Sequence, residues 1–160
     1  MARRIYNSPT GAVKVPALIW EMPPNHEDDE GESWAVTDAG PKTKPSAREP
    51  LVMLVEKVPG TNNPFAMGVT VGRVETNDII VDDASVSRFH AYLQLDERVD
   101  GWFLTDADSN NGTWVDGVKV VVSTRVRLAD GAVIRFGDAK LRFFMPDSVV
   151  KWVRQQGGKT

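Results

Sequence analysis

The feature that most constrains the fold of this chain is a series of short apolar runs between Leu51 and Met145. The runs are rich in β-branched and aromatic residues, and Gly, Asn and Asp separate them at close spacing, which is typical of β-strands. The pair Asp116-Gly117 lies between two such runs and predicts a hairpin. We therefore expect an all-β fold, an antiparallel β-sandwich. The runs read LVMLVEKV, MGVTVGR, DIIV, FHAYLQLD, GWFLTDA, VKVVV, TRVRL, GAVIRFG and KLRFFM.

The N-terminal part of the chain has a different composition. Residues 1–48 hold most of the prolines and an acidic run, HEDDEGE, at His26 to Glu32. Such a segment resists packing into a core, so we expect an extended, flexible tail over 1–48. Trp20 and Trp34 are unusual in a tail and indicate docking on the domain or on a partner. The segment ALIWEM could form a strand or a helix when bound.

These differences divide the chain into three parts. We expect a tail over 1–48, the folded domain over 49–146, and a short C-terminal helix with the chain end over 147–160. Apolar residues at helical spacing and Gly157 as a stop signal predict that helix.

Composition and charge exclude several classes of protein. The 160 residues contain no cysteine, which excludes disulfides and thiolate zinc sites. A formal net charge of -3 argues against broad attraction to nucleic acid. No apolar stretch has the length of a signal peptide or a membrane span. We therefore expect a cytoplasmic protein without nucleic-acid or membrane partners.

A set of donor side chains and a glycine falls in the loops between the predicted strands. A phosphorylated side chain needs donors for three oxygens and a fixed positive charge. The guanidinium of Arg73 matches phosphate geometry, Ser87 adds a hydroxyl, and Gly72 allows a close approach of the backbone. The set comprises Gly72, Arg73, Ser87, Arg88, Asn110 and Asn111.

In this order the residues closely resemble the forkhead-associated (FHA) domain family, over about residues 51–146. The resemblance implies an FHA/SMAD-like β-sandwich that recognises phosphothreonine in partner proteins. It implies phosphate binding by Arg73, Ser87, Arg88 and Asn110, and peptide-backbone binding by Asn111. It implies that Gly72, His90, Gly112 and Thr113 shape the site.

The function that follows is a phosphothreonine-binding signalling adaptor that acts downstream of a Ser/Thr protein kinase. The alternative is a phosphate-independent structural or assembly module on the same sandwich. Arg73, Ser87 and Asn111 favour the adaptor, because a scaffold has no physical need for that donor cluster.

Catalysis and metal binding find little support in the residues. Ser87 lies in ASVSRFH rather than in the Gly-x-Ser-x-Gly turn of a hydrolase. His90 is expected to be a buried strut that shapes the loop of Ser87. His26 stands beside an acidic run that is typical of a solvated segment. We expect no enzyme, no metal and no cofactor.

The N-terminal segment also offers an internal ligand. Thr10, Thr37 and Thr43 lie within it, and about thirteen residues from Thr37 to Leu51 would reach roughly 20 Å. Phosphorylation of one of these threonines could then produce an intramolecular complex. The other interpretation is a linker that binds nothing.

Overall fold

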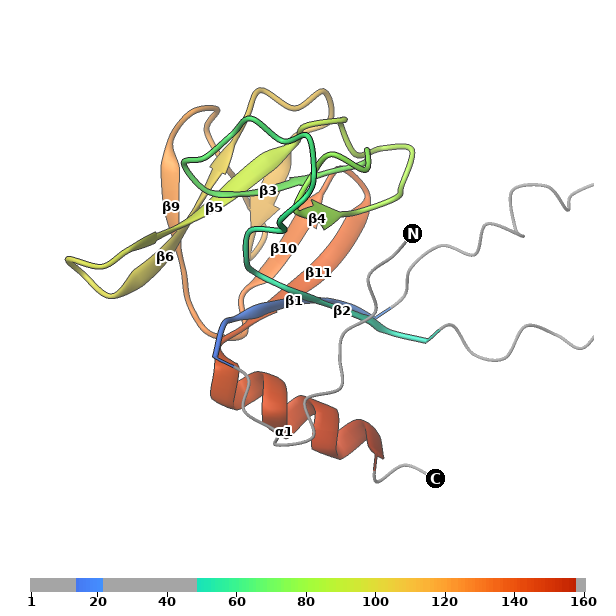
Figure 1. Cartoon of the computed structure of the whole chain (residues 1–160), viewed down its shortest axis with the longest axis vertical. Helices are drawn as coiled ribbons and strands as arrows, with labels where there is room; N and C mark the ends of the chain where they lie inside the picture. The colour runs from blue at the N-terminus through green and yellow to red at the C-terminus, as the bar shows by residue number, and fades with distance from the viewer. Residues whose placement is uncertain (1–13, 22–48, 158–160) are drawn as a thin grey trace, which may run out of the picture.

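Two β-sheets pack face to face in the computed structural model, which describes residues 14–21 and 49–157 (Figure 1). Strands pair antiparallel except β3 and β4, which pair in parallel. This architecture confirms the predicted sandwich. Sheet A has the order β2 (Leu51–Leu54), β1 (Ala17–Trp20), β11 (Ala139–Phe144), β10 (Val133–Phe136), β7 (Thr113–Val115) and β8 (Val118–Lys119). Sheet B has the order β4 (Ile79–Ile80), β3 (Val69–Gly72), β5 (Ala91–Asp96), β6 (Gly101–Asp106) and β9 (Arg125–Leu128).

The core lies between the sheets and follows from alternation along the strands. In β11 the buried residues Ala139, Leu141 and Phe143 alternate with residues on the outer face. Leu93 and Leu104 face them from sheet B and are fully buried. Burial of each large apolar side chain contributes about 1.5–3 kcal/mol. The period of two in the sequence therefore sets which face of each strand meets the other sheet.

The expectation of a flexible tail over 1–48 is wrong for Ala17–Trp20, which form β1. This strand lies between β2 and β11, with Leu18 opposite Phe143 and Trp20 opposite Leu51. Leu18 is fully buried and Trp20 is 4% exposed. The neighbouring strands β2 and β11 satisfy the backbone hydrogen bonds of this apolar run. Burial of its side chains outweighs the unfavourable composition of the residues around it.

The remaining N-terminal predictions fall on residues 1–13 and 22–48, outside the described residues. Residues 22–48 connect β1 to β2, so this part is a connection between paired strands rather than a terminal tail. It starts and ends at one place on sheet A, because Trp20 pairs with Leu51. The features outside the described residues are Thr10, His26, Trp34, Thr37 and Thr43.

The predicted hairpin at Asp116-Gly117 is confirmed. These two residues join β7 to β8 with φ angles of 49° and 83°, as a type I′ turn requires. Gly137, with φ 56°, opens the two-residue turn between β10 and β11.

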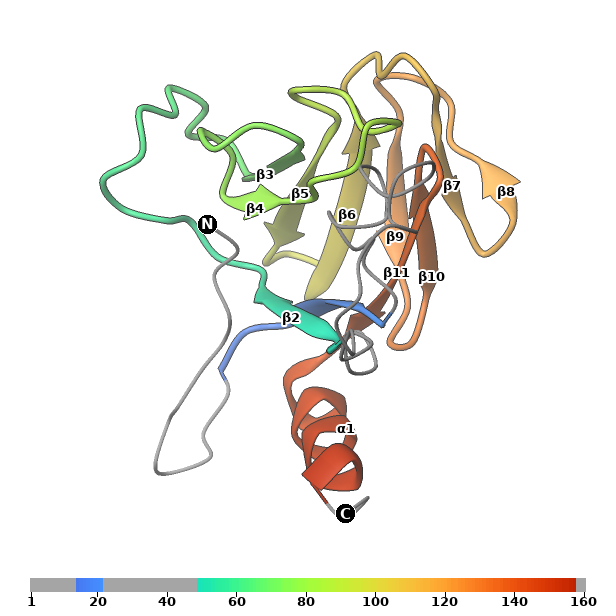
Figure 2. The same cartoon turned by 90° about the vertical axis from the view of Figure 1, so that its right-hand side faces the viewer.

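The C-terminal helix α1 (Pro146–Gly157) follows β11 and projects beyond the sandwich (Figures 1 and 2). Its start is fixed by Asp130, whose carboxylate accepts bonds from the Met145 N–H at 2.7 Å and the Ser148 hydroxyl at 2.6 Å. Proline suits the first position of a helix, where its missing N–H has no partner to lose. In the described part of the chain, no helix is long and apolar enough to cross a membrane.

Candidate functional site

Three loops meet at one end of the sandwich (Figure 2) and carry the predicted donors. Arg73 follows β3, Ser87 precedes β5, and Asn110 lies between β6 and β7. The backbone N–H of Arg73 donates to the Ser87 carbonyl at 3.0 Å. The backbone N–H of Asn110 donates to the Ser87 hydroxyl oxygen at 2.9 Å. The structure thus brings together residues that are far apart in sequence.

Several donors of this cluster have no partner among the described residues. Arg73 uses Nε to bond the Val86 carbonyl at 2.9 Å, and no bond within the described residues engages its two terminal nitrogens. The Ser87 hydroxyl accepts from Asn110, and its own proton stays available. Arg88 is exposed, and within the same ranges its side chain contacts no acid. The site therefore presents positive charge and hydroxyl donors to solvent.

His90 ties two of these loops together and is fully buried. Its Nδ1 accepts the N–H of Ser87 at 3.0 Å, so the proton resides on Nε2, which donates to the Gly112 carbonyl at 3.0 Å. Burial lowers the pKa of His90, against the opposing effects of the Gly112 carbonyl and the Asp106 charge. A neutral imidazole with both nitrogens engaged is a structural strut rather than a general base.

Asn111 and Gly112 complete the third loop. The Asn111 side-chain N–H donates to the Ser85 carbonyl at 2.8 Å, which leaves its amide oxygen as an acceptor. Gly112 has φ 89°, a backbone conformation that glycine adopts without strain. Its N–H donates to the Ser109 hydroxyl at 3.0 Å.

Gly72 is required by close packing rather than by a positive φ. A Cβ at this position would overlap the carbonyl oxygen of Arg88. That oxygen also accepts the side-chain N–H of Asn77 at 2.6 Å, and Asn77 bonds the Val74 carbonyl at 3.0 Å as well. The loop with Arg88 can therefore lie directly on the end of β3.

Asp106, which was not among the residues predicted from the sequence, organises the loop of Asn110. Its carboxylate accepts bonds from the Ser109 N–H at 3.0 Å, the Ser109 hydroxyl at 2.6 Å and the Thr113 hydroxyl at 2.6 Å. Burial would raise the pKa of Asp106, but these bonds from Ser109 and Thr113 outweigh it and hold the pKa below its ordinary value. An Asp and a Ser shortly before an Asn-Gly turn are the sequence pattern from which this role of Asp106 could have been predicted.

Asp78, also not predicted from the sequence, organises a second part of sheet B. Its buried carboxylate accepts the backbone N–H groups of Thr70 and Val58, each at 2.9 Å, and pairs with Lys57 at 2.7 Å. Burial opposes its ionisation, yet the bond from Lys57 and the backbone donors keep its pKa below the ordinary value. Asp78 thereby fixes the segment after β2 against β3.

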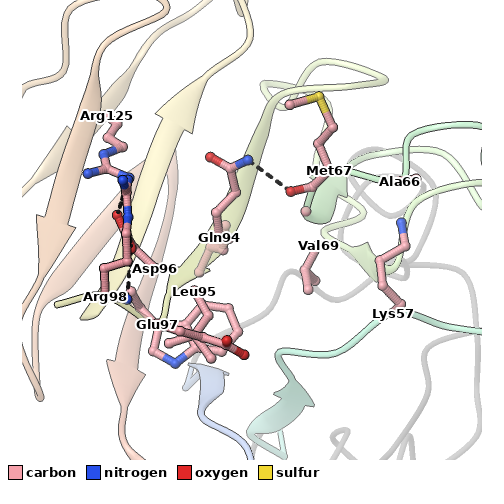
Figure 3. Close-up of a pocket in the computed structure, with 13 residues that line it drawn as sticks. Lys57, Ala66, Met67, Val69, Gln94, Leu95, Asp96, Glu97, Arg98 and Arg125 are labelled. Carbon is pink, nitrogen blue, oxygen red and sulfur yellow. Dashed lines mark hydrogen bonds and ion pairs between the residues drawn. The ribbon is translucent and has the colours of Figure 1, made fainter. Parts of the chain in front are cut away.

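A hollow of about 450 Å³ lies elsewhere on sheet B, where β5 ends and β3 begins (Figure 3). Its lining includes Met67, Leu95 and Trp102 together with the ion-paired Asp96 and Arg125. None of the predicted donors lines it. The candidate site is the loop cluster, which lies apart from this hollow. Among residues 14–21 and 49–157, no group of three or more His, Cys, Asp and Glu side chains is placed to hold a metal ion.

Comparison with known proteins agrees with this geometry. Residues 69–137 match the sequence model of the FHA domain family. The chain contains an FHA domain. FHA domains bind phosphothreonine peptides, and the family is not a catalytic one. The match includes all three loops of the FHA domain that meet around Ser87.

Relatives of this FHA domain occur in longer proteins. The transcriptional regulatory protein EmbR of Mycobacterium tuberculosis is 30% identical over 109 residues, which cover 68% of this chain and 27% of EmbR. The FHA domain-containing protein FhaB of the same species is 35% identical over 69 residues, 43% of this chain and 42% of FhaB. The chain therefore spans less than half the length of these curated relatives.

A solved structure supports the FHA fold. The FHA domain of an Arabidopsis thaliana hypothetical protein superposes with a TM-score of 0.50 at 20% identity. The match covers 82% of this chain and 86% of that one. At this identity it bears on the fold alone.

Proposed function

We propose that this FHA domain binds a phosphothreonine in a partner protein at the cluster of Arg73, Ser87 and Asn110. The observation that supports the proposal is the Ser87 hydroxyl, which accepts the Asn110 N–H and keeps a proton for a ligand, next to the exposed guanidinium of Arg73. A dianionic phosphate matches such a set of charged and neutral donors.

Each residue then has a chemical role. Arg73 and Arg88 supply positive charge, and Ser87 and Asn110 donate to phosphate oxygens. The amide oxygen of Asn111, which the bond to Ser85 leaves open, accepts an N–H of the peptide backbone. Positioning of these groups falls to Gly72, His90, Gly112 and Thr113.

The expected affinity follows from the number of contacts. A hydrogen bond to a charged group contributes about 1.5–3 kcal/mol. Three or four such contacts can supply most of the roughly 8 kcal/mol that corresponds to micromolar binding. The domain needs no deep pocket for this interaction, in agreement with an open loop cluster.

In this proposal the protein is a signalling adaptor downstream of a Ser/Thr protein kinase, and it acts in the cytoplasm where ATP supports phosphorylation. The competing function is a structural or assembly module that uses the sandwich without phosphate. Matched phosphorylated and unmodified peptides distinguish the two, because a phosphate-independent module binds both equally.

The chain itself is a second candidate source of the phosphothreonine. Residues 22–48 hold Thr37 and Thr43, and they leave β1 on the side where β11 begins. The turn before β11 contacts the site loops, since Asp138 N–H donates to the Ser85 hydroxyl at 2.7 Å. Thr10 is the third candidate. Mass spectrometry of the native protein tests this source, and so does peptide binding after deletion of 1–13 or replacement of 22–48 by a short linker. No phosphorylation, or an unchanged affinity in both variants, rejects it.

An oriented phosphothreonine peptide library, screened against wild type and Arg73→Ala, tests the main proposal. We expect selective capture by wild type and none by the variant. Equal capture by both proteins contradicts the assignment of Arg73.

A further inference from the structure

The outer face of sheet A carries a row of positive side chains beside the candidate site. The strand register places Lys119 of β8 next to Trp114 of β7, Trp114 next to Arg135 of β10, and Arg135 next to Lys140 of β11. We call Lys119, Arg135 and Lys140, with Trp114 among them, the basic row. Arg142 lies two residues further along β11 on the same face.

Alternation shows that the basic row faces outward. The residues on either side of Lys140, Ala139 and Leu141, are buried in the core, and Lys140 is exposed. The same alternation holds in β10, where Ile134 and Phe136 are buried on either side of Arg135. Side chains that pair across antiparallel strands share a face, so the row forms one surface.

Stacking holds the middle of the basic row in place. The guanidinium carbon of Arg135 lies 3.6 Å from the ring centroid of Trp114, and Lys119 Nζ lies 5.6 Å from it. Arg135 Nη1 also donates to the Gly137 carbonyl at 2.7 Å. These contacts order the cations at little further entropy cost when a ligand binds.

No ion pair within the described residues involves the basic row. Carboxylates elsewhere do find partners, as Asp96 does with Arg98 and Arg125. The row is therefore a local concentration of positive charge on a chain whose net charge is -3. Such a patch attracts an anionic ligand. It is too small for nucleic acid, whose affinity depends on many phosphate contacts.

The basic row is continuous with the phosphate-binding loops. Gly137, which accepts the bond from Arg135, is followed by Asp138, whose N–H donates to the Ser85 hydroxyl. Ser85 in turn accepts the Asn111 side chain at 2.8 Å. Asn111 precedes Trp114 by three residues, about 10 Å of extended chain. A peptide anchored at Asn111 can therefore reach the row within a few residues.

We propose that the basic row binds an acidic segment of the phosphorylated partner, a few residues from the phosphothreonine. This inference rests on the proposed function and specifies its ligand as a phosphothreonine peptide with a flanking cluster of Asp and Glu. The loop cluster supplies the phosphate contacts, and the row selects among phosphopeptides by charge.

Calorimetry with three phosphopeptides tests this proposal in the full chain. All three share the core sequence selected from the library; one has neutral flanks, one an acidic N-terminal flank and one an acidic C-terminal flank. The test variant is Lys119→Gln with Lys140→Gln. The matched control is Lys151→Gln with Arg154→Gln, which removes two exposed charges from α1 instead.

We expect one acidic flank to tighten binding about three- to tenfold at low salt, since two or three exposed charge pairs contribute modestly each. The gain should persist in the α1 control and vanish in the Lys119/Lys140 variant and in 0.5 M salt. Equal binding of all three peptides to wild type overturns the proposal. This holds also if the cause is that the chain's own acidic run at 26–32 occupies the basic row. A gain that survives in the Lys119/Lys140 variant also overturns it.

Failure of the proposed function gives a different result. The neutral-flank phosphopeptide then binds no better than its unmodified form, and the acidic-segment proposal is rejected with it. Circular dichroism and thermal unfolding of both double variants check that the fold is unchanged.

Discussion

The hydroxyl oxygen of Ser87 accepts a hydrogen bond from the backbone N–H of Asn110 at 2.9 Å. This bond joins two loops separated by 23 positions in the sequence. It also fixes the oxygen while the hydroxyl proton stays available to a ligand, because a hydroxyl both donates and accepts. Ser87 thus links the two loops and is also the proposed hydrogen-bond donor to the bound phosphate.

Ser87→Ala should weaken phosphopeptide binding by about 1.5–3 kcal/mol, since one donor to a charged group is lost. The unpaired Asn110 N–H is exposed, so the free energy of unfolding should fall by only about 0.5–1 kcal/mol. Calorimetry and urea unfolding measure the two effects. Unchanged peptide affinity contradicts the role of Ser87.

Gly72→Ala should destabilise the fold by about 1–3 kcal/mol, because the new methyl group overlaps the Arg88 carbonyl. Gly60→Ala is the matched control: Gly60 has φ 84° and no atom within 4 Å of the added methyl. It should cost about 1 kcal/mol through backbone strain alone. Urea unfolding measures the free energy of unfolding of both variants. A smaller loss in Gly72→Ala than in Gly60→Ala would contradict the close packing of Gly72 against Arg88.

Acid should destabilise the protein through His90. Its folded pKa lies below its ordinary value of 6.5, so the unfolded chain binds the proton more tightly. The contribution of His90 to stability is full above pH 6.5 and is lost as the pH falls through its folded pKa, with a slope of at most about 1.4 kcal/mol per pH unit. Urea unfolding at pH 7.5 and 5.5 measures the change.

A control uses the other histidine. His26→Gln should keep this pH dependence, whereas His90→Gln should remove it. If His26→Gln loses the pH dependence of stability, the assignment of that dependence to His90 is wrong.

Asp106→Asn should destabilise the loop that carries Asn110 and lower the free energy of unfolding by about 2–4 kcal/mol. The amide nitrogen would face the donors of Ser109 and Thr113 that the carboxylate now accepts. Asp108→Asn is the control, because Asp108 is exposed with φ 62°, which asparagine tolerates. Thermal unfolding should separate the two variants, and similar stabilities exclude the Asp106 network as an organiser.

Removal of residues 1–48 should abolish cooperative folding. It deletes β1 from between β2 and β11 and exposes the apolar surface that Leu18 and Trp20 cover. Deletion of 1–13 alone retains β1 and should retain a cooperative transition in circular dichroism. A stable fragment 49–160 contradicts the structural role of β1.

The sandwich could be predicted because its strands are amphipathic. In β5 and β11 the alternation of buried and exposed positions is visible in the sequence. For β1 the sequence indicated a strand or a helix without deciding between them, because four apolar residues between prolines carry no period and its neighbours β2 and β11 are distant in sequence. Tertiary pairing decided its conformation.

The sequence indicated candidate site residues, but it could not show how they are organised. The tautomer of His90 depends on Gly112, 22 positions away. The contact of Ser85 with Asp138 spans 53 positions. Such long-range contacts leave no local pattern, and the same holds for the basic row, which exists only through strand register.

Calorimetric titration of the full chain with one phosphothreonine peptide and its unmodified counterpart tests the central claim most directly. The phosphorylated peptide should bind with micromolar affinity and the unmodified peptide should not bind measurably. Arg73→Ala should lose the phosphopeptide while it keeps a cooperative unfolding transition. Equal binding of both peptides, or full affinity in Arg73→Ala, would contradict recognition of phosphate by this loop cluster.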